Sequence, residues 1–276
     1  MEMRYAVHPD HAAAMDTGEL RDAFLVEDLF TKDTLRLIYS HNDRLIIGGV
    51  VPIQEIALDV DPKLIGTPSF LERREMGVIN IGGAGVVHVD GESYRLASRD
   101  GIYLGRGVNQ VIFVSDDQSN PAKFYLNSAP AHTSYPVSVV RFDEAEAMSI
   151  GDSGTSNRRT IRKFIHPGGV KSCQLVMGMT SLEVGSVWNT MPTHTHERRM
   201  EAYCYFDLKD ENVVFHFMGE PTQTRHLIVR QQQVILSPPW SIHSGTGTSN
   251  YTFVWGMAGE NQAFDDMDGV PMANLR

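Results

Sequence analysis

The chain has 276 residues, a formal net charge of −10 at pH 7, 42% hydrophobic residues and 21% charged residues. This is the composition of an ordinary globular protein with room for one large or two medium domains, and it excludes a disordered chain and a collagen-like fibre. The excess of acidic residues argues against a nucleic-acid partner. The longest apolar run, at residues 45–53, is far shorter than the roughly 18 residues that cross a bilayer. The N-terminus lacks a secretory signal, so we expect a cytoplasmic protein without a membrane partner.

Helical patterns are confined to three short stretches, at residues 8–15, 16–24 and 142–148. From about residue 34 onward, short runs of β-branched and aromatic residues alternate with glycine, proline, asparagine and aspartate. This alternation predicts a mainly β protein with a few short helices, and the regular spacing of short strands is typical of a β-sandwich or β-barrel. The clearest predicted strands cover residues 78–81, 86–89, 111–114, 213–217 and 251–255.

Two local features are predicted to be structural. The glycine-rich segment at residues 82–85 leads into a predicted strand, whereas a phosphate-binding loop needs a helix N-terminus behind it, so we expect a tight hairpin there. Cys173 and Cys204 cannot build a disulfide framework and form no Cys-x-x-Cys pair. They are predicted to be buried, unreactive thiols.

The most linker-like segment, at residues 143–157, lies near the middle of the chain and predicts two β-domains, at residues 1–150 and 151–276. An internal repeat supports this division, because residues 70–76 resemble residues 195–201 at an offset of 125 positions (197 − 72). A run of β-forming residues follows each copy. The chain is therefore interpreted as two copies of one module.

The strongest chemical signal is a pair of histidines, His194 and His196, whose spacing of two places both imidazoles on one face of a strand. Glu201 has the opposite parity, so a turn at residues 197–199 must intervene before its strand can present the carboxylate to the same point. The fourth candidate ligand is His243, which follows a β-rich run. Three neutral imidazoles and one carboxylate suit zinc, iron, manganese or nickel and leave positions open for water or substrate. The pattern predicts a catalytic metal site.

Hydrogen-bonded core or surface histidines are the alternative interpretation. The chain has only 11 histidines, however, and it combines three features that rarely occur together by chance. These are a His-x-His motif, a glutamate five residues later and a distant Pro-x-x-x-His motif. His216 and His226 lie in strand-like runs without comparable spacing, so we expect them to be core residues or to support the ligands from behind. The metal site is therefore the favoured interpretation.

The segments around these residues resemble one family over nearly the whole chain, from about residue 7 to residue 276. The chain is similar to the bicupin family of 4-deoxy-L-threo-5-hexosulose-uronate ketol-isomerases, also called 5-dehydro-4-deoxy-D-glucuronate isomerases, which act in pectin breakdown. The segments that carry the resemblance are residues 70–84, 155–160, 189–201, 240–245 and 259–268.

The resemblance implies two cupin-type β-barrels and a zinc ion bound by His194, His196, Glu201 and His243, with no departure from the family pattern at any of the four. It implies isomerisation of 5-dehydro-4-deoxy-D-glucuronate to 3-deoxy-D-glycero-2,5-hexodiulosonate. It also implies a cytoplasmic homohexamer.

The offset of the internal repeat bears on the number of metal ions. It places Ser69, Leu71 and Met76 opposite the two histidines and the glutamate of the C-terminal module. Leucine and methionine cannot hold a hard or borderline divalent ion in a closed site. We expect one metal ion per chain, bound within residues 151–276, and an N-terminal module that serves packing and assembly.

An aldose–ketose isomerisation moves a carbonyl from C1 to C2 through an enediolate, so it needs a proton-transfer group close to the metal. Tyr203 lies on the predicted face of Glu201, and Lys163 lies outside the predicted barrel strands; these three are the candidates. A basic cluster at residues 158–163 either binds the substrate carboxylate or forms a solvated surface. The cations considered for that carboxylate, because guanidinium pairs bidentately with it, are Arg158, Arg198, Arg199 and Arg225.

Two other functions remain open from the residues alone. The same ligand set suits Fe(II) in an oxygenase, which would require oxygen for turnover. A non-catalytic sugar-binding or storage module is the second alternative, and its ligand affinity would not change when metal is removed.

Overall fold

The structure is a computed structural model that describes all residues from Met1 to Arg276, and it is mainly β. It divides into two compact units, each formed by three stretches of chain. The first unit contains Met1–Arg4, Leu29–Glu146 and Phe164–Met177, and the second contains Tyr5–Asp28, Ala147–Lys163 and Gly178–Arg276. The division is therefore not a single border at residue 150, because the N-terminal helices belong with the C-terminal half of the chain.

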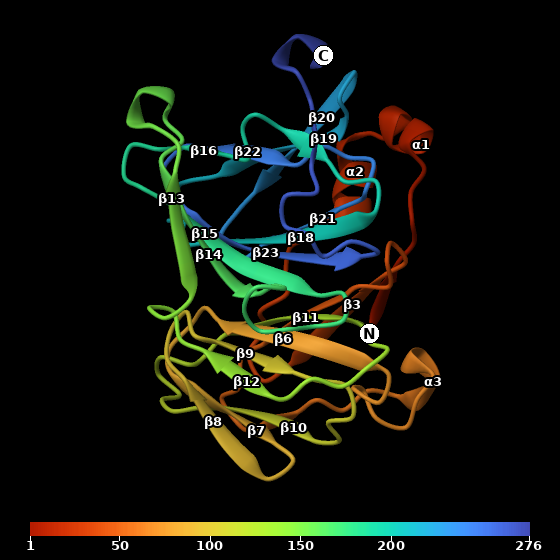
Figure 1. Ribbon diagram of the computed structural model, residues 1–276, viewed down its shortest axis with the longest axis vertical. Coiled ribbons are helices and arrows are strands. Elements are labelled where there is room, and N and C mark those ends of the chain that lie inside the picture. The colour runs from red at the N-terminus through yellow and green to blue at the C-terminus, as the bar shows by residue number, and fades with distance from the viewer. The chain divides into compact units, whose positions relative to one another are not determined.

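The first unit contains two sheets with the core between them (Figure 1). The larger sheet has the order β1 (Glu2–Arg4), β3 (Leu35–Ser40), β4 (Ile46–Val50), β11 (Phe124–Pro130), β6 (Arg74–Asn80), β9 (Gly101–Leu104) and β12 (Ser138–Val140). The smaller sheet has the order β5 (Ile56–Ala57), β10 (Val111–Ser115), β7 (Gly85–Val89) and β8 (Glu92–Leu96). The short helix α3 (Pro62–Ile65) precedes β6.

The second unit repeats this plan. Its larger sheet has the order β13 (Glu146–Ile150), β14 (Arg159–Ile165), β15 (Val176–Leu182), β23 (Thr252–Gly259), β18 (Arg199–Phe206), β21 (Val234–Ser237) and β2 (Leu25–Val26), of which β14 and β15 run on into the segment counted with the first unit. Its smaller sheet has the order β16 (Trp188–Asn189), β22 (Ser244–Gly247), β19 (Val214–Glu220) and β20 (Gln223–Val229). A two-stranded pair, β17 (His194–Thr195) with β24 (Asp268–Gly269), and 3-10 turns at Ser153–Thr155 and Met272–Asn274 complete it.

The two strand orders correspond position by position. β6 and β18 are both the fifth strand of a seven-stranded sheet, and each begins with a buried arginine, Arg74 or Arg199. These arginines are 125 residues apart (199 − 74), which is the offset of the sequence repeat. The predicted duplication of a mainly β, cupin-type module is confirmed.

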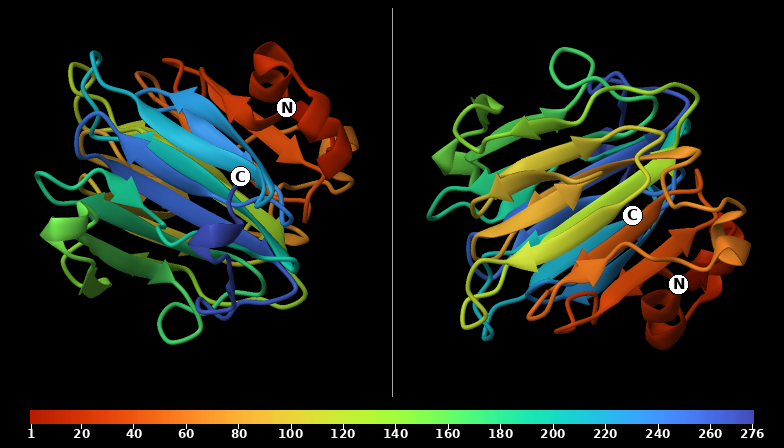
Figure 2. Two further views of the ribbon diagram at one scale, coloured as in Figure 1. Left: turned by 90° about the horizontal axis from the view of Figure 1, so that it is seen from above. Right: turned by 90° about the horizontal axis from the view of Figure 1, so that it is seen from below.

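The two N-terminal helices form where the sequence predicted them, as α1 (Pro9–Ala14) and α2 (Thr17–Phe24). Asp16 and Glu19 exchange backbone hydrogen bonds in a capping box that starts α2. Both helices lie beside β19 and β20 of the second unit (Figure 2). Phe24 buries the end of α2 by packing edge-on against Trp240, with ring centroids 6.3 Å apart.

The predicted helix at residues 142–148 is wrong. Residues 142–144 form a turn, and the chain continues as the edge strand β13. Asp100 fixes the turn, because its carboxylate accepts hydrogen bonds from the Phe142 amide and the Arg141 guanidinium. Pairing with β14 then overrides the weak helical preference of the Glu-Ala-Met sequence.

The glycine-rich segment at residues 82–85 is not a hairpin either, although the strand β7 does follow it as expected. β6 and β7 belong to different sheets, so the segment crosses from one sheet to the other. The buried Asn80 side chain holds the crossing by accepting a hydrogen bond from the Gly82 amide and donating one to the Gly83 carbonyl.

Both cysteines are free and buried, as predicted. Burial raises the pKa of the Cys173 thiol and, more strongly, that of Cys204. Neither thiol is therefore in a reactive, ionised state at neutral pH.

Candidate metal centre

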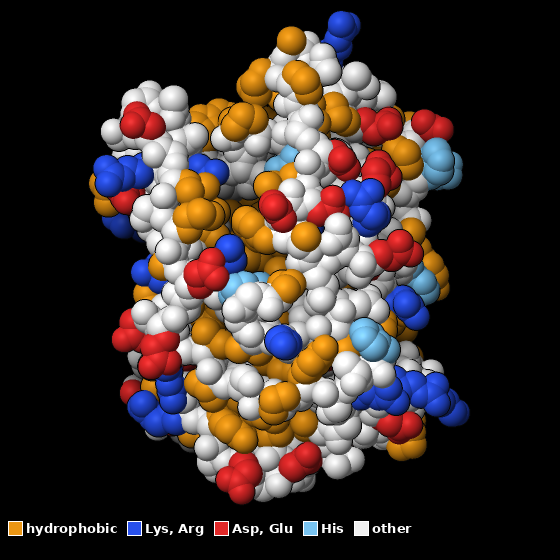
Figure 3. Space-filling view, viewed as in Figure 1, with side chains coloured by type: hydrophobic (Ala, Val, Ile, Leu, Met, Phe, Trp, Pro, Cys, Tyr) orange, Lys and Arg blue, Asp and Glu red, His pale blue; other side chains and the backbone are white.

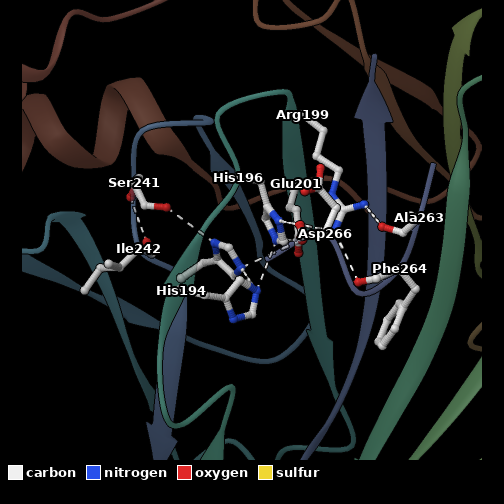
Figure 4. A network of polar contacts seen from close by, with 10 residues as sticks. His194, His196, Arg199, Glu201, Ser241, Ile242, Ala263, Phe264 and Asp266 are labelled. Atoms are coloured by element: carbon white, nitrogen blue, oxygen red, sulfur yellow. Dashed lines mark hydrogen bonds and ion pairs between the residues drawn. The ribbon is translucent and has the colours of Figure 1, made fainter. Parts of the chain in front are cut away.

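The four predicted ligands come together at one end of the second unit. His194 lies on β17, His196 follows it directly, Glu201 lies on β18 and His243 immediately precedes β22. The predicted turn is present at residues 197–198, and the Arg199 amide donates to the His196 carbonyl across it. Without the turn, the alternation of side chains along a strand would place Glu201 on the opposite side from the two histidines. The turn shifts this alternation by one residue, so the carboxylate points to the same side as the two imidazoles (Figure 4).

The donor atoms surround a single point. Nε2 of His194 is 3.0 Å from Nε2 of His196 and 2.9 Å from Nε2 of His243. Oε1 of Glu201 is 2.7 Å from Nε2 of His196 and 3.8 Å from Nε2 of His243. All four ligand atoms lie within 4.8 Å of one another. Donors about 2.0–2.2 Å from a shared ion are about 3.3–3.6 Å apart in a tetrahedron and about 2.8–3.1 Å apart as neighbours in an octahedron, so the spacing is close to that of one ion.

Contacts on the far side of the rings orient the nitrogens. Nδ1 of His196 is 2.6 Å from the Asp266 carbonyl, which requires a hydrogen on Nδ1 and leaves a lone pair on Nε2. Nδ1 of His243 faces the Ser241 carbonyl at 3.4 Å. Lone pairs that face one another at about 3 Å repel unless a cation lies between them. The donor set therefore fits a bound metal ion.

The electrostatics of the cluster favour the metal-binding protonation states. Burial lowers the pKa of His194 to about 3 and that of His243 to about 4, so both imidazoles are neutral at physiological pH. Burial alone would raise the pKa of Glu201, but the neighbouring His243 and the hydrogen bond with His196 bring it below its ordinary value. Neutral imidazoles and an ionised carboxylate are the forms that bind metal.

A cavity of about 320 Å³ opens in front of the ligands. Apolar side chains gather around its mouth in the upper half of Figure 3. The apolar lining consists of Met148, Ile150, Ile161, Met191, Pro192, Phe253, Trp255, Met257, Phe264 and Met267, and the polar lining besides the ligands consists of Arg159, Thr180, Thr190, Arg199 and Tyr203. The cavity is large enough for a sugar-sized molecule and has few polar groups to orient it.

Tyr203 lies in this cavity beside Glu201, as the alternation along β18 predicted. Its hydroxyl hydrogen bonds to the Glu201 carboxylate and to Thr190. Burial and the adjacent carboxylate raise the pKa of Tyr203 well above its ordinary value. Tyr203 is therefore a proton donor at neutral pH, not a ready base. Lys163 is absent from the cavity lining, and its ammonium lies 5.2 Å from the centroid of the Phe264 ring.

Arg199 lines the cavity, but both of its Nη groups are engaged within the protein, and its Nε is buried without a hydrogen-bond partner (Figure 4). Its guanidinium donates to the backbone carbonyls of Ala263, Phe264 and Asp266 and contacts the His196 ring. Burial lowers the pKa of Arg199. The side chain therefore fixes the segment 263–266, which in turn orients His196.

The other three predicted cations lie away from the cavity. Arg158 is exposed and pairs with Glu183 at 3.1 Å. Arg198 is exposed and pairs with Asp266 at 2.7 Å. Arg225 donates to the backbone carbonyl of Ala13 in α1.

Arg159 is the cation that lines the cavity with donors to spare. It is the first residue of β14, and its single hydrogen bond runs from Nη1 to the Asn157 carbonyl at 2.8 Å. Nε and Nη2 have no protein acceptor. Burial lowers the pKa of Arg159, so an anion in the cavity would relieve the cost of its desolvation. The sequence marked the basic cluster that contains Arg159 but not which member faces inward.

A buried polar network lies behind the four predicted ligands. The Tyr205 hydroxyl and Nδ1 of His216 are 2.8 Å apart, and Asn189 donates to the Tyr251 hydroxyl at 2.7 Å. Burial lowers the pKa of His216 to about 3. His216 is thus a neutral core residue behind the site, as the sequence predicted. The same prediction is wrong for His226, which is exposed on β20 because its side chain lies on the outer face of that strand.

Comparison with known proteins places the chain in a family. The model of the KduI/IolB family matches residues 24–270. The chain is 53% identical to the 4-deoxy-L-threo-5-hexosulose-uronate ketol-isomerase of Dickeya dadantii (strain 3937) and 52% identical to the protein of that name from Yersinia pseudotuberculosis, over the full length of both chains in each case. A crystal structure of an IolB-like protein from Salmonella typhimurium covers 90% of this chain and 96% of its own, with a TM-score of 0.71 and 13% identity.

The fold and the cluster of His194, His196, Glu201 and His243 define a bicupin protein whose second module could hold a metal ion. The chain belongs to the KduI/IolB family. None of its helices has the length and apolar character of a membrane-spanning segment.

Proposed function

We propose that this protein is a metal-dependent ketol-isomerase that converts 5-dehydro-4-deoxy-D-glucuronate to 3-deoxy-D-glycero-2,5-hexodiulosonate. The observation that carries the proposal is the convergence of three imidazoles and one carboxylate at the wall of a sugar-sized cavity. The chain is 52–53% identical, over its full length, to two proteins that bear the name of this isomerase, and this similarity supports the same reaction.

His194, His196, Glu201 and His243 would hold the metal ion, and zinc is the ion we propose. Three nitrogens and one carboxylate oxygen are borderline ligands of the kind that zinc accepts. A bound divalent ion supplies Lewis-acid stabilisation of the negative charge that develops when the substrate is deprotonated.

Arg159 would bind the substrate carboxylate. Its free Nε and Nη2 can donate two parallel hydrogen bonds to a carboxylate, and the apolar walls of the cavity strengthen such a pair by excluding water. This assignment takes the place of Arg158, the member of the basic cluster that was among the four candidates from the sequence, because Arg158 is paired with Glu183 outside the cavity.

Glu201 and Tyr203 would handle the proton. The reaction removes the proton from C2 and adds one to C1. In addition, the oxygen at C2 loses its proton to become a carbonyl, and the oxygen at C1 gains a proton to become a hydroxyl. Glu201 is the only carboxylate that lines the cavity, so it is the candidate proton acceptor, and the protonated Tyr203 hydroxyl can supply a proton to a developing oxyanion. Lys163 is not needed in this scheme, because it lies outside the cavity lining.

A single assay tests the proposal. The purified protein is incubated with the uronate, and loss of the aldehyde is followed with and without a chelator and with and without oxygen. We expect turnover that chelation abolishes, that added Zn²⁺ restores and that anaerobic conditions do not change. Turnover only with oxygen would support the oxygenase alternative, and sugar binding without turnover and unaffected by chelation would support the binding module.

The assembly and the location predicted from the family resemblance stay predictions. Light scattering coupled to size-exclusion chromatography would test the homohexamer, and fractionation of the producing cell would test the cytoplasmic location.

A further inference from the structure

The first unit contains a cavity of its own, with a volume of about 360 Å³, in which no metal ligands gather. It lies near α3, where basic side chains and a histidine gather at the lower right of Figure 3. Its lining comes entirely from the first unit and consists of Met3, Tyr39, His41, Arg44, Leu64, Ile65, Thr67, Arg73, Arg74 and Pro130. Three of these ten residues are arginines and none is acidic.

Arg74 forms the rigid floor of this cavity. It is only 9% exposed, its Nη2 donates to the carbonyls of Arg44 and Ser128 at 2.6 and 2.7 Å, and its Nε donates to the Ser128 hydroxyl at 3.0 Å. These bonds hold the guanidinium in one orientation and leave Nη1 without a protein acceptor. Burial is the main cause that lowers the pKa of Arg74, to about 10, and the nearby charge of Arg44 lowers it further.

Arg44 and Arg73 are exposed, and neither side chain has an ion pair or a hydrogen bond within the protein. Arg44 has a φ of 55° in the turn between β3 and β4, a left-handed position that favours glycine or asparagine. The turn therefore does not account for an arginine at this position.

The adjacent carboxylate does not neutralise the cavity. Glu75 is fully buried and is absent from the lining. Its two oxygens accept four hydrogen bonds, from the Tyr103 hydroxyl and from the amides of residues 173–175, at 2.6–2.9 Å. Three positive charges thus meet around an acid-free cavity in a chain whose net charge is −10. An oxyanion would remove their mutual repulsion and use the free donors.

We propose that this cavity is a binding site for a small organic anion, whose carboxylate or phosphate group lies among the guanidinium groups of Arg44, Arg73 and Arg74. Met3, Leu64, Ile65 and Pro130 form an apolar side against which a carbon skeleton can pack. The site is independent of the metal centre and of the activity proposed for it, because its residues belong to the other unit.

Isothermal titration tests the site in an Arg159→Gln background, which weakens anion binding at the metal cavity. The probes are D-galacturonate, inorganic phosphate and the uncharged D-galactose. The variant pair Arg44→Gln/Arg73→Gln removes the two exposed cations and leaves the buried Arg74 in place. The matched control is Arg95→Gln, which removes an exposed arginine of the same unit that pairs with Asp116 outside the cavity.

We expect one equivalent per chain of D-galacturonate or phosphate to bind and D-galactose not to bind. Loss of charged hydrogen bonds should weaken anion binding at least about tenfold in Arg44→Gln/Arg73→Gln, with no change in Arg95→Gln. Binding of the uronate alone would identify a sugar acid, and binding of phosphate alone a phosphate compound. Absence of binding by either anion, unchanged binding in the double variant or equal weakening in Arg95→Gln would overturn the proposal.

Discussion

The mouths of the two modules differ in chemistry although their strand orders correspond. In the second unit, β18 presents Glu201 to three imidazoles, whereas the equivalent position of β6 in the first unit is Met76, which is fully buried in an apolar core. Leu71, opposite His196 in the sequence repeat, belongs to the same core. The comparison shows that the fold of a module does not depend on the metal-site residues. The first module has buried apolar side chains at these positions, and the second has buried polar side chains.

The largest expected effect comes from removing a ligand of the second unit. His243→Ala should bind no metal tightly and should lose turnover by at least about 10³-fold, because three donors no longer enclose the ion. The fold should persist, since the strands are held by apolar packing. Turnover and circular dichroism check this, with the exposed His226→Ala as control. Near-normal turnover of His243→Ala would contradict the ligand assignment.

The next effect concerns the equivalent position of the first unit. Met76→Glu would bury a carboxylate in an apolar core with no imidazole to stabilise it, and should cost about 3–5 kcal/mol of the free energy of unfolding. The reciprocal Glu201→Met should cost much less stability while abolishing metal binding. Urea denaturation of both variants measures the difference. A Met76→Glu variant that is as stable as the parent, or that binds a metal ion, would show that the environment of residue 76 is not apolar and does not differ from that of Glu201.

Arg159 provides a smaller, purely functional contrast. Arg159→Gln should raise KM for the uronate about 10–100-fold, because one charge-assisted bidentate contact is lost. The neighbouring Arg158→Gln should leave KM within about twofold, since Arg158 is paired outside the cavity. Steady-state kinetics of the two variants distinguish them. A larger increase in KM for Arg158→Gln than for Arg159→Gln would indicate that Arg158, and not Arg159, binds the substrate carboxylate.

The smallest expected effect is on the pH dependence of stability. Burial lowers the pKa of His216 to about 3, against about 6.5 in an unfolded chain. Between these values the unfolded state binds more protons, so stability is fully present above pH 6.5 and falls as the pH decreases. Each such group contributes up to about 1.4 kcal/mol per pH unit.

His216 is the third residue of β19, and the third residue of β7 in the first unit is Val87, which does not titrate. In metal-free protein, His216→Gln should therefore have a shallower loss of unfolding free energy between pH 6.5 and 4.5 than the parent. Equal slopes in chemical denaturation at several pH values would show that His216 is protonated in the folded protein.

The sequence predicted that His194, His196 and Glu201 gather at one point because their signal is local: a spacing of two on a strand, a polar turn and a strand of opposite parity. It could not select Arg159 over Arg158, since that choice depends on where β14 begins and which of its faces meets the cavity. The role of Arg199 depends on a segment more than 60 residues away, 263–266. The helix predicted at 142–148 failed for a related reason, because strand pairing with β14 outweighs local preference.

The most direct test of the central claim is the ratio of metal to chain after extensive dialysis, measured by elemental analysis. The wild-type protein should hold one metal ion per chain, and His194→Ala/His196→Ala should hold none, because only the second unit gathers ligands. A wild-type ratio near two, or a ratio near one that persists in the double variant, would contradict the account by showing that the first unit also binds metal.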